Sequence, residues 1–397
     1  MEYPDVVIVS GARTPIGRFQ GALSAIPAPE LGGVAIKAAV ERAGIDGALV
    51  DEVLMGNVVQ AAEGQAPARQ AAIKGGLPVS AGATTINKIC GSGLKAVMLA
   101  AQAIRSGDGD VFVAGGMENM NLAPYYLTKA RTGYRMGNAE MIDGMIYDGL
   151  WCAFEKHHMG ISAEWIAREY EVSRQAQDEL AYESHRRALA AMDAGLFKDE
   201  IVPVPLPGKK GSPPIFFDTD ETPRRDTTLE TLAKLKAAFQ EGGSVTAGNA
   251  PPISDGAAAL VVMSGKKAAE LGVKPIARVT GYAQAAVKPL ELFTAPIFAV
   301  RRLMHKLDVT IDHFDLIEVN EAFASQTIAD GRELGMDWAK VNVNGGAVAL
   351  GHPIGCSGAR VLVTLLYALQ QRNLKTGLAT LCLGGGEGVA LSVEMLD

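Results

Sequence analysis

The chain has 397 residues, of which 48% are apolar, 20% are charged and 45 are glycine. This length predicts two or three domains around a large buried core, and the composition excludes a disordered or fibrous protein. The formal net charge of −7 argues against nucleic acid or an anionic membrane as the main partner. The sequence contains no secretory leader pattern and no apolar run long enough to span a bilayer. We therefore expect a soluble, cytoplasmic protein that binds no nucleic acid and no membrane.

Short β-branched segments alternate with alanine-rich helical segments along the chain. We predict buried strands at 6–10 and 111–114, and buried helices at 93–106 and 359–370. This alternation is typical of βαβ units, so it predicts an α/β fold with a largely parallel sheet.

Two stretches of the chain resemble each other, residues 90–104 and residues 355–369. Each is followed by a short polar turn, a strand and a glycine pair, at 110–119 and 379–388. Two matched segments in the same order indicate an internal duplication. We therefore expect two similar α/β halves packed together.

The segment between these repeats, 121–251, is more charged and less regular, and it includes a proline-rich stretch at 202–214. We interpret it as an inserted loop domain that covers a substrate. The predicted amino-terminal half is then 1–120 plus 252–274, and the carboxyl-terminal half is 275–397.

Cys90 lies directly before the first predicted helix, with Gly91 and Gly93 close behind it. The glycines allow the backbone to approach a substrate, and the unpaired N–H groups at a helix start favour a thiolate. We expect the helix terminus to lower the pKa of the thiol by about one unit, so that a partner base is still needed. The pattern favours a nucleophile, and the alternative is a small cysteine buried in the core.

The base and a second sulfur come from two glycine-rich segments. Of the six histidines, His352 alone lies in such a segment, 342–360, and imidazole can take a thiol proton at neutral pH. Cys382 ends a predicted strand before a triple-glycine turn. One thiol would carry an acyl group while the other moves a proton; a disulfide-exchange pair or a buried strand cysteine are the alternatives. Four cysteines without a CxxC pair predict neither a disulfide scaffold nor a metal site.

Four segments, in this order, resemble the signature blocks of thiolases. They are NKICGSGLKAV (87–97), NEAFA (320–324), GGAVALGHPIGCSGAR (345–360) and CLGGGEG (382–388). The likeness extends over the whole chain through GARTPIG (11–17), GGMENM (115–120) and VTAGNA (245–250). It implies a duplicated thiolase fold, in which two βαβαβαββ halves pack as α-β-α-β-α layers.

The resemblance also implies roles for five residues. Cys90 matches the cysteine that a donor thioester acylates, and His352 matches the histidine that activates it and helps to bind a thioester oxygen. Cys382 matches the cysteine that moves the α-proton of the acetyl-CoA acceptor. Asn320 matches the asparagine that holds a water, which forms an oxyanion hole with the histidine. The backbone amides of Cys90 and Gly384 form the other oxyanion hole, since a Claisen condensation needs two sets of donors.

The segment around 156–164 resembles the biosynthetic, acetoacetyl-CoA type of thiolase, which implies a set of coenzyme A and acyl contacts. The residues implied are His158, Met159, Arg224, Ala247, Pro251, Leu292, Ala322 and Phe323. Lys209, Lys210 and Arg225 are candidates for extra positive charge near the phosphates, and an ordinary solvated loop is the alternative.

The chain departs from the family at three places. Pro251 replaces the usual serine and offers neither hydroxyl nor N–H to the pantetheine. Leu292 and Phe293 replace a Met-Gly pair beside the acyl pocket, which leaves the acyl preference open. Cys356 replaces a small residue, and we interpret it as packing.

The resemblance implies a reversible condensation of two acetyl-CoA to acetoacetyl-CoA and CoA, through an acyl-Cys90 intermediate in ping-pong order. The first alternative is a 3-ketoacyl-CoA thiolase acting on longer or unusual chains. A decarboxylating ketoacyl synthase would need a second histidine where Cys382 stands, and a silent scaffold would lack one of the three reactive residues. We expect no cofactor or metal besides the acyl-CoA substrates, and a homotetramer built as a dimer of dimers.

Overall fold

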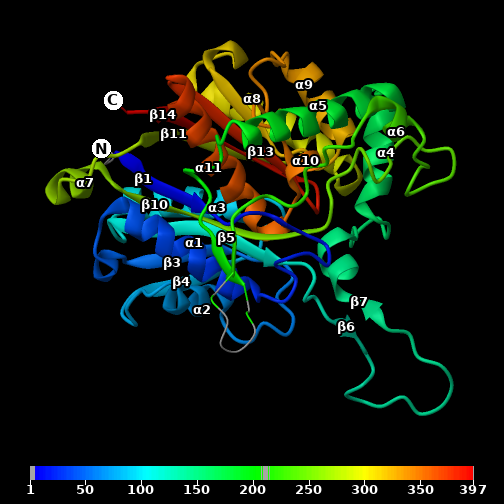
Figure 1. Cartoon of the computed structure of the whole chain (residues 1–397), viewed down its shortest axis with the longest axis horizontal. Helices are drawn as coiled ribbons and strands as arrows, with labels where there is room; N and C mark the ends of the chain where they lie inside the picture. Colours follow the sequence, from blue (N-terminus) through cyan, green and yellow to red (C-terminus); the bar gives the residue numbers. More distant parts are fainter. Residues whose placement is uncertain (1–4, 207, 209–212, 214, 397) are drawn as a thin grey trace.

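The computed structural model of the chain describes residues 5–206, 208, 213 and 215–396 (Figure 1). Within it, one order of helices and strands occurs twice. The first copy is β1 (Val6–Arg13), α1 (Ala28–Ala43), β3 (Glu52–Gly56), α2 (Pro67–Lys74), β4 (Gly82–Ile86), α3 (Ser92–Ser106), β5 (Val111–Asn119) and β10 (Ser254–Ser264). The second copy is β11 (Ala277–Ala286), α8 (Ala295–Leu307), β12 (Leu316–Val319), α9 (Ala324–Leu334), α11 (Ile354–Arg372), β13 (Thr376–Leu383) and β14 (Glu387–Met395).

The second copy has a single bridge where the first has β4. Val341 pairs in parallel with Ile317 of β12 at the position that corresponds to β4 beside β3. The short elements are β2 (Gly17–Arg18), η1 (Gly47–Leu49), α7 (Gly265–Leu271), η3 (Pro289–Thr294), η4 (Ile311–His313) and α10 (Ala347–Leu350). The repeated order agrees with the duplication expected from the sequence.

The strands form one ten-stranded mixed sheet in the order β12-β13-β14-β11-β1-β10-β5-β3-β4, with β2 beside β10. The two halves of the sheet meet where β1 pairs with β11 at only two positions, Val7 with Arg278 and Ile8 with Ala277. Parallel pairs join β3 to β4 and β5, and β12 to β13. The prediction of a largely parallel sheet was wrong, because β10 and β14 each return antiparallel beside the preceding strand.

Helices fill three layers around the two halves of the sheet (Figure 1). α3 and α11 lie between the halves, since Val97 and Leu362 belong to one core that includes strands of both. α1 and α2 cover the outer face of the first half, and α8 covers the outer face of the second. This is the α-β-α-β-α arrangement expected from the sequence. The helix predicted at 359–370 begins earlier, at Ile354, although the glycines at its start lower its helix propensity.

The inserted segment lies mainly against the second half. Its elements are β6 (Tyr125–Tyr126), β7 (Ile142–Asp143), the π-helical turn η2 (Met145–Leu150), α4 (Met159–Glu169), α5 (Arg174–Asp193), β8 (Val204–Leu206), β9 (Ile215–Phe217) and α6 (Leu229–Ala233). α4 packs on α9 and η3, and α5 packs on α9 and α10. The loop between β6 and β7 extends away from the body of the molecule (Figure 1).

Candidate active site

A pocket of about 420 Å³ lies where the two halves and the inserted segment meet. Every catalytic and acyl-CoA contact residue predicted from the sequence lines it except Asn320, whereas Arg225, a candidate for extra positive charge, does not. Those lining it are Cys90, His158, Met159, Arg224, Ala247, Pro251, Leu292, Ala322, Phe323, His352, Cys382 and Gly384. Residues far apart in the chain therefore converge on one cavity.

A close crossing of the two central helices brings the halves of this site together. A Cβ added to Gly93 of α3 would lie 2.5 Å from the backbone nitrogen of Ala359 in α11. A Cβ on Gly358 would overlap the backbone nitrogen of Leu94 in the same way. Because these glycines allow backbone contact, the starts of α3 and α11 lie side by side. Cys90 precedes one start and His352 precedes the other.

Cys90 lies on a strained turn at the beginning of α3. Ile89, directly before it, has φ of 46°, a conformation unusual for a β-branched residue. Burial raises the pKa of the Cys90 thiol to about 12, and the Gly384 backbone N–H that donates to the sulfur opposes this. We expected a pKa lowered by the helix start. The desolvation of the pocket outweighs that effect, so the resting sulfur is a neutral thiol.

His352 is buried, and a hydrogen bond with a serine determines which of its ring nitrogens carries the proton. Its Nδ1 lies 2.6 Å from Ser357 Oγ, and that hydroxyl donates to the carbonyl of Pro353 at 2.8 Å. Since the hydroxyl proton is used by Pro353, Nδ1–H donates to Ser357 and leaves Nε2 as the free acceptor. Burial lowers the pKa of His352 to about 3, and the Arg360 charge adds to this shift. The imidazole is therefore neutral and able to accept a proton.

Cys382 is the penultimate residue of β13 and is enclosed in the same pocket. Its side chain is 1% exposed and packs with Leu292, Phe293 and Ala322. Burial raises the pKa of the Cys382 thiol well above its usual range, and the nearby Cys90 adds to this. The two thiols therefore rest uncharged beside the neutral imidazole of His352, in a pocket that His158 also lines.

Asn320 is fully buried beside His352 and does not itself line the pocket. Its Nδ2 lies 3.5 Å from His352 Nδ1, a contact between two donors in the tautomer that Ser357 selects, and its Oδ1 finds no hydrogen-bond partner among the described residues. The preceding strand β12 and the following Glu321 hold its backbone. The Glu321 carboxylate accepts hydrogen bonds from Asn342 Nδ2 at 2.9 Å and from the Val348 N–H at 3.0 Å.

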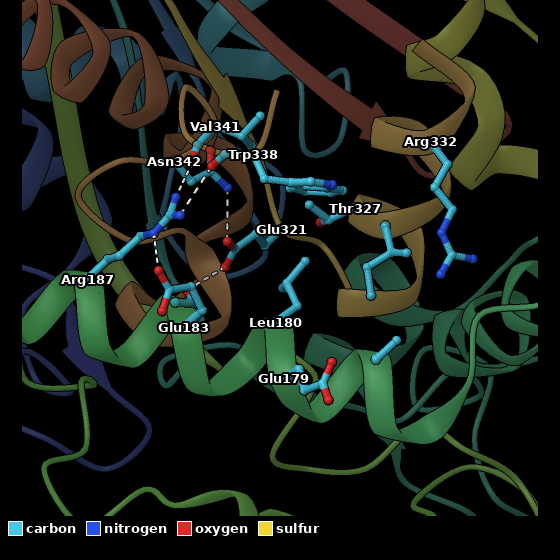
Figure 2. A pocket seen from close by; sticks show the side chains of 13 residues that line it. Glu179, Leu180, Glu183, Arg187, Glu321, Thr327, Arg332, Trp338, Val341 and Asn342 are labelled. Carbon is cyan, nitrogen blue, oxygen red and sulfur yellow. Dashed lines mark hydrogen bonds and ion pairs between the residues drawn. The ribbon is translucent and has the colours of Figure 1, made fainter. Parts of the chain in front are cut away.

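A second cavity, of about 330 Å³, lies behind Glu321 between α5 and α9 (Figure 2). At its inner end Glu321 also accepts a hydrogen bond from Ser184 Oγ at 2.7 Å. At its mouth Glu183 pairs with Arg187 at 2.7 Å (Figure 2). These charged groups therefore make structural contacts within the fold. None of the predicted site residues lines this cavity.

Glu118 connects the loop after β3 to the start of α11. Its carboxylate accepts hydrogen bonds from the backbone N–H groups of Val58 at 3.1 Å, Val59 at 3.1 Å and Gly355 at 2.8 Å. Burial raises the pKa of Glu118, whereas these N–H donors oppose the shift. The carboxylate therefore fixes α11 relative to the first half of the molecule, next to the pocket.

The mouth of the pocket is formed by the inserted segment. His158 caps α4 by accepting a hydrogen bond from the Gly160 N–H at 3.1 Å. Arg224 is exposed, and its backbone N–H donates to His185 Nδ1 at 3.1 Å. Arg225 pairs with Asp193 on the surface, in agreement with a solvated loop. Lys209 and Lys210 lie outside the described residues.

Two residues that contribute to the site, Phe239 and Ser357, are absent from the residues predicted from the sequence. Phe239 stacks on the ring of His158 at 4.8 Å and lines the pocket, but no motif marks it. The sequence does contain a signal for Ser357. It follows the candidate base His352 by five residues at the start of a helix, where a serine can orient the imidazole. Within the part of the chain that the structure describes, no group of side chains is arranged to hold a metal ion, and no helix is long and apolar enough to cross a membrane.

Comparisons with known proteins agree with this arrangement. The profile described as "Thiolase, N-terminal domain" matches residues 6–266, and "Thiolase, C-terminal domain" matches residues 273–395. An acetyl-CoA acetyltransferase of Pseudomonas aeruginosa is 57% identical over 98% of this chain and 99% of its own. One of Cupriavidus necator is 55% identical over 98% and 99%. The crystal structure of the Bacillus anthracis acetyl-CoA acetyltransferase superposes with a TM-score of 0.97 at 44% identity, covering 99% of each chain.

Proposed function

The chain belongs to the thiolase family, and we propose that it is an acetyl-CoA C-acetyltransferase. It condenses two acetyl-CoA reversibly to acetoacetyl-CoA and CoA. The observation that carries this is the presence of Cys90, His352 and Cys382 in one enclosed pocket. Two thiols and one base in a single site suit acyl transfer coupled to carbon–carbon bond formation.

The first half-reaction acylates Cys90. As the sulfur attacks the thioester carbonyl of acetyl-CoA, its proton passes to Nε2 of His352. A sulfur–carbon bond forms, the carbon–sulfur bond to CoA breaks, and the CoA thiolate takes the proton from the imidazolium. The neutral resting states of Cys90 and His352 support a proton transfer concerted with attack.

The second half-reaction forms the carbon–carbon bond. Cys382 passes its proton to His352 and, as the thiolate, takes a proton from the methyl group of the second acetyl-CoA. The resulting carbanion attacks the acetyl carbonyl on Cys90. The bond to Cys90 breaks, and its sulfur takes the proton from the His352 imidazolium, so that both thiols and the imidazole end neutral. The Gly384 and Cys90 backbone amides stabilise the tetrahedral oxyanion, and His352 with Asn320 stabilises the enolate oxygen. Asn320 Oδ1, which has no hydrogen-bond partner within the described part of the chain, supports a water-bridged role for that side chain.

The remaining substrate contacts are assigned to the pocket lining. His158 and Met159 border the pantetheine, and the exposed Arg224 at the mouth faces the adenine nucleotide. Pro251 also lines the pocket and offers no hydrogen bond, so the pantetheine uses other partners near it. The acyl-CoA thioesters are substrates, and the reaction as written needs no further cofactor.

We extend the proposal to assembly and compartment. Exposed apolar side chains on the extended loop, including Tyr125, Met136 and Met141, support a homotetramer formed as a dimer of dimers. All four cysteines are free thiols, which supports a reducing compartment such as the cytoplasm.

Steady-state thiolysis tests the proposed function against the alternative of a longer-chain 3-ketoacyl-CoA thiolase. The rate with acetoacetyl-CoA and CoA is compared with the rate with 3-ketohexanoyl-CoA and CoA. We expect kcat/KM to be higher for acetoacetyl-CoA. A strong preference for the longer chain would replace this proposal with the alternative.

A further inference from the structure

We propose that Phe293 closes the acyl end of the active-site pocket and restricts the transferred acyl group to acetyl size. This inference rests on the proposed function and specifies its substrate class. Phe293 lies in η3, outside the segments that carry the reactive residues, yet its ring lines the same cavity.

The ring of Phe293 lies in the same apolar cluster as Cys382, one of the two reactive sulfurs, together with Ala322 and Leu292. Phe293 is 3% exposed and lines the cavity that Cys90 also lines. The charged contact of the pocket, Arg224, is at the exposed mouth. A thioester with its nucleotide at the mouth and its carbonyl at Cys90 therefore directs its acyl carbons toward this apolar wall.

The backbone that carries Phe293 is held directly against the β13–β14 hairpin. The Val287 N–H donates to the Gly386 carbonyl at 2.7 Å. A Cβ on Gly386 would meet the backbone of Val287 and Lys288, and a Cβ on Gly388 would lie 2.6 Å from the backbone of Ala295. These glycines let η3 and its flanks contact the hairpin backbone to backbone. Phe293 is thus positioned rigidly relative to Cys382 and Gly384 on the same hairpin.

Neighbouring aromatic rings fix the orientation of the Phe293 ring. It meets Phe323 edge to face at 5.3 Å and 69°. Phe323 in turn meets Phe239 edge to face at 6.0 Å, and Phe239 stacks on His158 at 4.8 Å. A ring packed into such a series cannot turn aside without losing these contacts. Longer acyl chains therefore meet a wall that does not yield.

The test compares variants of the full-length protein on two thiolysis substrates, acetoacetyl-CoA and 3-ketohexanoyl-CoA. Phe293→Ala removes the wall, and each added methylene in an apolar pocket is worth about 10-fold or more in kcat/KM. We expect the ratio of kcat/KM for the longer over the shorter substrate to rise by about 10-fold or more. Phe298→Ala is the matched control, because Phe298 is 48% exposed on α8 and does not line the pocket; its ratio stays at the wild-type value.

Phe293→Leu is measured alongside, because the Ala substitution leaves a cavity that could prevent folding. The Leu variant keeps an apolar side chain and is expected to raise the ratio by about threefold. An unchanged ratio in folded Phe293 variants, with melting curves as the check, overturns the inference. So does a wild-type enzyme that already cleaves both substrates equally well. A wild-type preference for the longer substrate would overturn the proposed function itself. An unchanged ratio in the variants of an enzyme that prefers acetoacetyl-CoA would overturn only the role of Phe293.

Discussion

The two halves of the molecule use an equivalent serine in different ways. In the first half Ser92 Oγ accepts from the Lys88 N–H at 2.8 Å and donates to the Ile89 carbonyl at 2.6 Å, which closes the turn that presents Cys90. In the second half Ser357 donates to the Pro353 carbonyl and accepts from His352. The same helix start therefore presents a nucleophile in one copy and orients a base in the other.

The strands that follow these helices differ as well. In the second half β13 turns directly into β14 through Gly385 and Gly386, both at positive φ of 88° and 93°. In the first half the inserted segment separates β5 from β10. The hairpin of β13 and β14 holds Cys382 beside the pocket. In the first half, the segment inserted between β5 and β10 covers the pocket. The first copy thus supplies Cys90, and the second supplies His352 and Cys382.

The largest expected effect is that of replacing Cys382, which separates its role from that of Cys90. In Cys382→Ala, acetyl-CoA should still acylate Cys90, but condensation should fall by on the order of 1000-fold, because no group takes the α-proton. Single-turnover acylation and steady-state condensation measure the two steps. Cys356→Ala is the control, since Cys356 is buried in α11 and does not line the pocket. Normal condensation in Cys382→Ala would assign the proton transfer to another group.

The paired serines give the next effect. Ser357→Ala removes the acceptor that selects the His352 tautomer, so the acylation rate should fall by about 10- to 100-fold with little change in the KM for acetyl-CoA. Ser92→Ala removes only backbone contacts of the turn and should slow acylation by less than about 10-fold. Equal losses in both variants would mean that Ser357 supports structure rather than the base.

The helix crossing should contribute mainly to stability. Gly93→Ala forces a methyl group against the backbone of α11, and we expect the free energy of unfolding to fall by about 2 kcal/mol. Gly82→Ala is the control, because a Cβ at Gly82 has only ordinary contacts, the nearest at 3.4 Å. Denaturant unfolding compares the two. Equal stability would show that the starts of α3 and α11 do not depend on this contact.

The smallest expected effect is that of pH on acylation. The pKa of His352 is lowered to about 3, so the ring stays neutral as pH rises above that value. The pKa of Cys90 is raised to about 12, so the thiol stays protonated below it. Neither group titrates between about pH 5 and pH 9, and the single-turnover acylation rate should vary less than about threefold there. An inflection within this window would indicate a thiolate–imidazolium pair instead.

The sequence predicted the α/β class, the duplication and about half of the residues that line the pocket, because the motifs that carry them are local and glycine-rich. The prediction of a parallel sheet was wrong because it followed the alternation of helices and strands and did not include the hairpin that joins β13 directly to β14. The direction of the Cys90 pKa was also wrong. A helix start is visible in a sequence, but the desolvation that outweighs it comes from residues distant in the chain. Phe239 was missed for the same reason.

The central claim is that Cys90 carries the acyl group, and intact-protein mass measurement tests it most directly. The enzyme is mixed with acetyl-CoA, quenched in acid and mapped by peptide digestion. The account predicts one acetyl group on Cys90 in the wild type and in Cys382→Ala, and none in Cys90→Ser. Acetylation of Cys90→Ser at the wild-type level, or an acetyl group mapped to Cys382 instead, would contradict it.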